Sequence, residues 1–301
     1  IEFSAADLIR DSLIDQSRAG RGGAVWFSST RDFDPDYQPK WMNPLYRTPS
    51  HGHTLLWMQN VTISKTVSTD STAGTGAMSL EGDVIAHLSA NVFLENEAAF
   101  GAAIYASQNS SAYVSNSLFE SNAATSMGAG IYFTGESMGN VLSSIFMYNS
   151  AKNGAAIAVA GSSNVSIATI TSVKGARTAF TSNVATEDGG GVRAQENSIV
   201  LISDADFSLN SARNGGALSF AHNAAAEIEV STIESNTAYS CGGGLATSST
   251  VPVKMTGIVS FLQNQAENGA SGGAVCSIVP TDGSLQCGAN PQLSKFPFML
   301  S

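Results

Sequence analysis

The chain has few charged residues for its length, and those that it has are scattered. Asp, Glu, Lys and Arg make up 13% of its 301 residues, and the 14 basic residues form no cluster. A basic patch is typical of proteins that bind nucleic acid, and polybasic segments attract proteins to anionic membranes. With a formal net charge of −10, the sequence indicates neither of these partners.

Long apolar runs and cysteines are also scarce. No run reaches the roughly 18 apolar residues that a membrane-spanning helix needs, so membrane insertion is not expected. Three cysteines are too few for a disulfide framework, and their spacing does not suit zinc. Cys276 and Cys287 are close enough in sequence to form one bridge, which would leave Cys241 unpaired. The alternative is that all three are free thiols.

What the chain does have is an internal repeat. An aromatic or aliphatic residue followed three positions later by Asn recurs seven times. The pairs are Phe93/Asn96, Phe119/Asn122, Phe146/Asn149, Phe180/Asn183, Phe207/Asn210, Ile233/Asn236 and Phe261/Asn264. After each pair comes a run of small residues that ends in an aliphatic one. These runs are Gly101–Ile104, Gly128–Ile131, Gly154–Ile157, Gly189–Val192, Gly215–Leu218, Gly242–Leu245 and Gly272–Val275. Two weaker copies precede them, around Ile14 and Ile63.

The period of this repeat, mostly 26 to 28 residues, predicts an all-β fold. It fits a coil of three short strands and three turns, whereas a helical solenoid would show apolar residues at a 3.6-residue period. About nine such coils predict a parallel β-helix, right-handed by the rule for parallel crossover connections. With a strand separation of about 4.8 Å, the rod would be on the order of 40 Å long.

Stacked coils place equivalent residues above one another. Ile104, Ile131 and Ile157 should form one inward column. The seven repeated Asn residues should form a buried ladder that hydrogen-bonds the turn from coil to coil. The residues on either side of the inward column are expected to point outward. They are nearly uncharged, and Trp26, Tyr105 and Tyr132 are aromatic residues among them. This face predicts a contact with another subunit, a neighbouring domain or the inserted segment 28–53, or simply reflects the small residues that tight coils need.

The Phe-x-x-Asn and Gly-Gly-Ala-Ile motifs resemble the repeats of chlamydial polymorphic outer-membrane proteins, and also pectin-lyase-like β-helices. The resemblance covers about residues 10–278. It implies one surface-displayed, often adhesive β-helix domain over residues 1–301 that is part of a longer polypeptide. The break in composition at residues 28–53 predicts an inserted loop, and residues 277–301 are expected to form a C-terminal cap or tail.

Acid hydrolysis of a glycan needs two carboxylates facing one cleft. Asp204 and Asp206 share strand parity, and Glu187 and Asp188 are expected about one coil below them. They are the best candidates for a catalytic pair, and the alternative is a solvated face of an acidic protein. Signatures of pectin-degrading enzymes, such as Gly-His-Gly and Arg-Ile-Lys, do not occur.

No metal or cofactor is predicted. Asp32, Asp34 and Asp36 have the spacing of a calcium loop, but Tyr37 and Asn43 stand where Gly and Glu are expected. The glycine runs precede strands rather than helices, so they are not phosphate-binding loops.

Further candidates lie at loops and turns. Asn60, Asn109 and Asn164 begin N-glycosylation sequons. The inserted loop 28–53 holds Trp41 and half of the prolines, and it either binds a partner or covers a hydrophobic seam.

The sequence therefore predicts a non-enzymatic structural or adhesive module outside the cell, with protein subunits, neighbouring domains or glycans as partners. The alternative is a carbohydrate-active enzyme or carbohydrate-binding module on the same fold.

Overall fold

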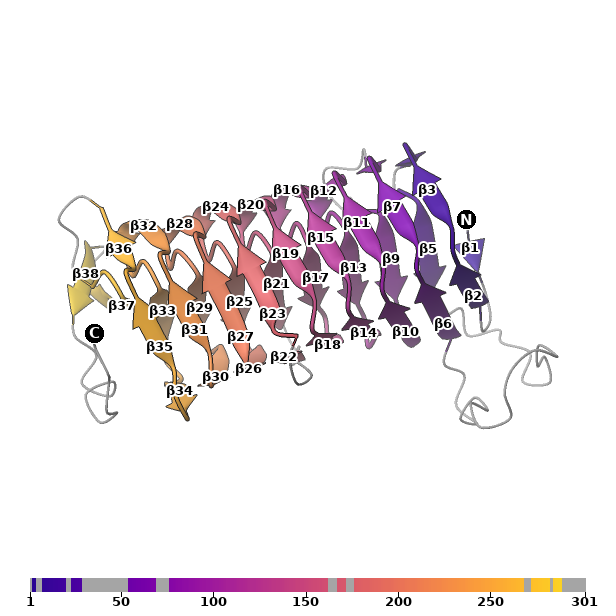
Figure 1. The fold of residues 1–301 in the computed structure, drawn as a ribbon. Coiled ribbons are helices and arrows are strands. Elements are labelled where there is room, and N and C mark those ends of the chain that lie inside the picture. Colours follow the sequence, from indigo (N-terminus) through magenta and orange to yellow (C-terminus); the bar gives the residue numbers. More distant parts are fainter. Residues whose placement is uncertain are drawn as a thin grey trace.

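A computed structural model of the chain describes residues 2–3, 7–19, 23–28, 54–68, 76–161, 167–171, 176–267, 272–281 and 284–288. These residues form an all-β solenoid without helices, a rod with β2 (Asp7–Arg10) near one end and β37 (Val275–Thr281) near the other (Figure 1). All its strand pairs are parallel except the last, in which β38 (Ser284–Gly288) pairs antiparallel with β37. The predicted parallel β-solenoid is thus confirmed. In this part of the chain no helix is long and apolar enough to span a membrane.

The predicted three strands per coil are wrong, because each coil contains four. Sheet A contains β1 (Glu2–Phe3), β5 (Val25–Ser28), β9 (Met78–Glu81), β13 (Ile104–Ser107), β17 (Ile131–Thr134), β21 (Ile157–Gly161), β25 (Val192–Glu196), β29 (Leu218–His222), β33 (Leu245–Ser249), β37 (Val275–Thr281) and β38 (Ser284–Gly288). Sheet B contains β2 (Asp7–Arg10), β6 (Thr54–Gln59), β10 (Val84–Ser89), β14 (Ser111–Ser115), β18 (Met138–Leu142), β22 (Ile167–Thr171), β26 (Ile199–Ser203), β30 (Ala225–Glu229) and β34 (Val253–Thr256).

The remaining strands form sheets C and D. Sheet C contains β3 (Leu13–Asp15), β7 (Thr62–Ser64), β11 (Val92–Leu94), β15 (Leu118–Glu120), β19 (Ile145–Met147), β23 (Thr178–Thr181), β27 (Ala205–Ser208), β31 (Thr232–Glu234) and β35 (Ser260–Leu262). Sheet D contains β4 (Arg18–Ala19), β8 (Val67–Ser68), β12 (Glu97–Phe100), β16 (Ala123–Met127), β20 (Ser150–Asn153), β24 (Val184–Asp188), β28 (Ser211–Asn214), β32 (Thr237–Cys241) and β36 (Gln265–Ala266). Sheet D is built from the fourth strand of each coil. The sequence does not predict it because its strands shift register within most pairs.

The repeated phenylalanines form the centre of the core. Phe93, Phe119, Phe146, Phe180 and Phe207 are fully buried, and neighbouring rings stack with centroids 4.4 to 5.0 Å apart. The predicted inward column of Ile104, Ile131 and Ile157 is also buried.

The asparagine ladder forms as predicted at the turn between sheets C and D. Asn149 is typical: its Nδ2 donates to Asn183 Oδ1 at 2.9 Å and to the Phe119 carbonyl at 3.0 Å. The ladder joins Asn96, Asn122, Asn149, Asn183, Asn210, Asn236 and Asn264, of which only the last is partly exposed. Because each amide bridges two coils, the ladder fixes their register and satisfies buried turn groups.

Tight bends separate the sheets. Gly101, with φ +52°, precedes β13, and a Cβ there would collide with the Ile104 carbonyl oxygen. This bend corrects one expectation from the sequence. Ala103 and its equivalents were expected to point outward, but they face the core from the corner, and Gly130 lies against the ring of Phe146.

Candidate functional site

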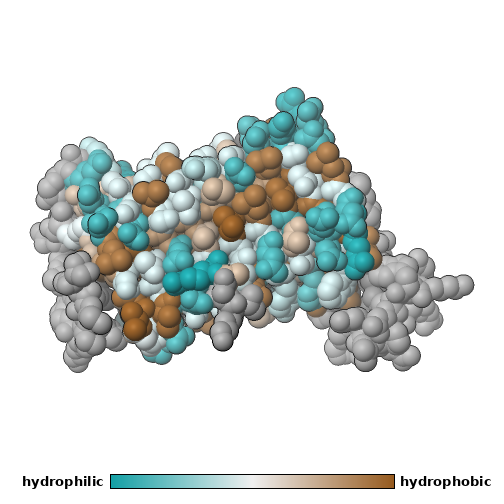
Figure 2. All heavy atoms as spheres, in the orientation of Figure 1, coloured by the Kyte–Doolittle hydropathy of each residue, from teal (hydrophilic) through white to brown (hydrophobic). Residues whose placement is uncertain are grey.

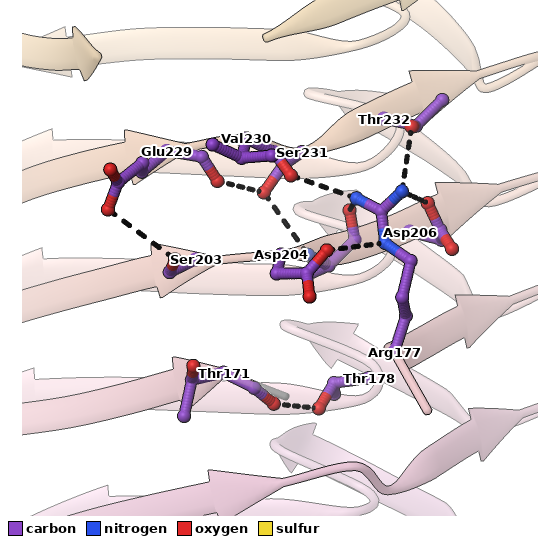
Figure 3. A network of polar contacts seen from close by, with 11 residues as sticks. Thr171, Arg177, Thr178, Ser203, Asp204, Asp206, Glu229, Val230, Ser231 and Thr232 are labelled. Atoms are coloured by element: carbon purple, nitrogen blue, oxygen red, sulfur yellow. Dashed lines mark hydrogen bonds and ion pairs between the residues drawn. The ribbon is translucent and has the colours of Figure 1, made fainter. Parts of the chain in front are cut away.

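The predicted catalytic acids are held by a single arginine. Arg177 Nε lies 3.0 Å from Asp204 Oδ1, and its Nη1 lies 3.1 Å from Asp206 Oδ1 (Figure 3). The side chain also reaches the next coil, where Nη2 donates to the Val230 carbonyl at 2.9 Å. Val230 is a β-branched residue at φ +42°, a strained conformation for such a side chain. We call this group the Arg177 clamp; it joins three successive coils.

Glu187 and Asp188 do not complete a catalytic pair with these acids. Both belong to β24 in sheet D, whereas Asp204 and Asp206 lie at and just before β27 in sheet C. Glu187 pairs with Lys152 at 3.2 Å, and Asp188 pairs with a buried Arg193 at 2.9 Å. The sequence placed these acids one coil apart but could not resolve that they lie on different sides of the coil.

The aromatic face predicted on sheet A is not an open surface at Tyr132. That side chain is only 8% exposed, and it packs with Met127, Ala158 and the half-buried Phe100. The reason is the unexpected fourth strand: its end lies beside the outer face of sheet A and forms an inside corner, which we call the A–D seam. Tyr105 and Trp26 are half-buried, so a contact of these two residues with another chain stays a prediction, and the inserted segment that they were also expected to meet lies, after residue 28, outside the described residues.

The A–D seam also corrects the predicted disulfide. Cys276 bonds to Cys241, with Cα atoms 5.7 Å apart, and not to Cys287. Cys241 ends β32 in sheet D and Cys276 lies on β37 in sheet A, so the two face one another across the seam. Cys287 lies on β38, where its backbone lies opposite that of Ile278 on β37.

A groove of about 400 Å³ runs along the outer face of sheet B, and the sequence did not predict it. One wall is a row of stacked rings. The Trp57 and His87 centroids are 4.1 Å apart, and those of His87 and Tyr113 are 4.9 Å apart. Since the ring faces cover one another, mainly ring edges remain for a ligand. We call this the sheet B groove; its other lining residues are Leu8, Arg10, Met58, Gln59, Leu88, Ser89, Val114, Ser115, Asn140 and Leu142.

The chemistry of the groove suits oxygen-rich ligands. Aromatic edges carry partial positive charge, and Arg10 adds a full positive charge. No Asp or Glu is among the described residues that line the groove, although the chain is acidic overall. Burial lowers the pKa of His87 and so favours its neutral form. A signal for this site was available, because Trp57, His87 and Tyr113 are spaced at about the coil period.

The remaining predicted positions are the three sequon asparagines and the inserted loop with Trp41. Asn60 and Asn109 are exposed at turns with positive φ, and Asn60 Nδ2 donates to Asp11 Oδ1 at 2.7 Å. Asn164, Trp41 and the inserted loop after residue 28 lie outside the described residues.

Comparison with known proteins adds no family. The chain matches no protein-family model, no curated protein and no solved structure.

Proposed function

We propose that the chain is a non-enzymatic structural or adhesive solenoid module of an extracellular or cell-surface protein, and that the sheet B groove is a ligand-binding surface. The observation that carries this proposal is the row of Trp57, His87 and Tyr113, in which Tyr113 is 42% exposed. Exposed aromatic side chains that line a groove are typical of binding sites. The Cys241–Cys276 disulfide supports an oxidising compartment.

A carbohydrate ligand is the second candidate that an observation favours. Positive ring edges on one side and the Gln59, Ser89 and Ser115 side chains on the other would meet the hydroxyl or carboxylate oxygens of a glycan. The Arg177 clamp supports binding rather than hydrolysis, because it engages Asp204 and Asp206 in ion pairs.

The test is a glycan array together with an assay of reducing-sugar release from acidic polysaccharides. We expect retention of a neutral or acidic glycan without turnover, and at least a tenfold loss of binding for Trp57→Ala/Tyr113→Ala. A matched control is Leu201→Ala/Lys254→Ala, at equivalent positions of the same sheet. Turnover that Asp204→Asn abolishes would refute the non-enzymatic proposal. Equal glycan binding by the two double variants would refute the proposal that the sheet B groove is the binding surface.

A further inference from the structure

The outer face of sheet C changes character along the rod. In β11, β15 and β19 the outward side chains that flank the buried phenylalanines are mainly apolar. Five of the six are apolar, and the sixth is Glu120. We call the five apolar ones the sheet C patch: Val92, Leu94, Leu118, Ile145 and Met147. Ile145 is 45% exposed and the other four are half-buried. Figure 2 shows this patch as a brown area over the three strands.

Strands that are apolar on both faces are typical of sheets covered on both sides. The inner face of these strands is covered by the core. In the described part of the chain, the outer face stays open at Ile145 and half-open at its neighbours. An exposed apolar patch of this kind marks a contact surface.

The sheet C patch is continuous with the sheet B groove. Leu142 lines the groove at the end of β18, and Ile145 begins β19 after the two-residue turn Ser143–Ser144. The apolar side chains of the patch therefore continue around the corner between sheets B and C in the same coils.

Charge distinguishes the occupants of the patch. Glu95, Glu97 and Glu120 lie in or beside it, exposed or half-buried, and none forms an ion pair with any described residue. A second copy of the chain, with its own net charge of −10, would bring like charges together. A partner with positive charge around an apolar centre would complement both features.

We propose that the sheet C patch is the docking surface for a different protein, which presents a strip of aliphatic side chains flanked by Lys or Arg. This inference does not depend on the groove's ligand, because it concerns other side chains and another sheet.

The probe is a soluble peptide that alternates leucine with lysine, compared with one that alternates leucine with glutamate. Binding is measured by fluorescence anisotropy at low and at physiological salt. We expect the lysine peptide to bind at least tenfold more tightly than the glutamate peptide, and more weakly as salt rises. Leu118→Thr/Ile145→Ser should reduce binding at least tenfold. Glu95→Gln/Glu120→Gln should reduce both the affinity and its salt dependence.

The matched control is Thr232→Ala/Ser260→Ala, which changes the same column of sheet C further along the rod and should leave binding unchanged. Thermal melting shows whether each variant is folded, and Trp57→Ala should bind the peptide normally. Equal binding by the patch variant and the control would overturn the proposal. A wild-type dimer in sedimentation that the patch substitutions dissolve would also overturn it, in favour of self-association.

Discussion

Sheet C has two regions with the same interior and different exteriors. The first region is β11, β15 and β19, and the second is β27, β31 and β35. Phe146 in β19 and Phe207 in β27 occupy the same buried column and are 0% and 1% exposed. The outward residues beside them differ: Ile145 lies on the first strand, and Asp206, paired with Arg177, on the second. The fold therefore dictates the inward residue in each coil and leaves the outward residue free. We infer that the outward residues carry the function.

The largest expected effect tests whether the two interiors are equivalent. Phe146→Ala and Phe207→Ala should each destabilise the chain by about 3–5 kcal/mol, because each removes a buried ring and leaves a cavity. Urea unfolding followed by circular dichroism measures both. A difference of several kcal/mol between them would show that the core is not uniform along the rod.

The asparagine ladder should be strongest in its middle. Asn149→Leu removes four buried hydrogen bonds of the Asn149 side chain, and we expect a loss of about 3 kcal/mol or more. Asn264→Leu, at the partly exposed end, should cost clearly less. The same unfolding experiment compares them, and a near-zero effect of Asn149→Leu would contradict a ladder that stabilises the fold.

The Arg177 clamp should stabilise the second region, where it holds Asp204 and Asp206. Arg177→Met removes two ion pairs and leaves Asp204 and Asp206 without their shared cation. Since these groups are partly exposed, we expect a loss of about 1–2 kcal/mol in free energy of unfolding. Lys152→Met, which removes one exposed pair, is the control and should change stability by less than about 0.5 kcal/mol. Equal losses would mean that the clamp is an ordinary surface interaction.

The smallest expected effect is a pH dependence of stability that comes from His87 in the sheet B groove. Burial lowers the pKa of His87 in the folded chain, whereas in the unfolded chain it stays near its ordinary value of about 6.5. Below that pH the unfolded state binds more protons, so this contribution to stability falls as pH drops toward the folded pKa. Melting temperatures measured from pH 7.5 to 5 should fall more steeply for the native chain than for His87→Gln. Identical slopes would show that burial does not perturb this ring.

The sequence predicts the parallel solenoid, the phenylalanine column and the asparagine ladder, because these depend on one residue per coil at a fixed period. It does not predict sheet D, because the strands of that sheet shift register from coil to coil. Without sheet D the A–D seam cannot be predicted. The sequence therefore predicts an exposed Tyr132 and the wrong partner for Cys276. The sheet B groove was missed for another reason: Trp57, His87 and Tyr113 are different residue types that share only their spacing.

Hydrogen exchange shows whether a partner binds the outer surface of β11, β15 and β19 and leaves that of β27, β31 and β35 free. The intact chain is compared with and without the leucine–lysine peptide. We expect slower exchange confined to β11, β15, β19 and the turns beside them, with β27, β31 and β35 unchanged. Protection spread evenly over both regions, or centred on β27 to β35, would contradict it.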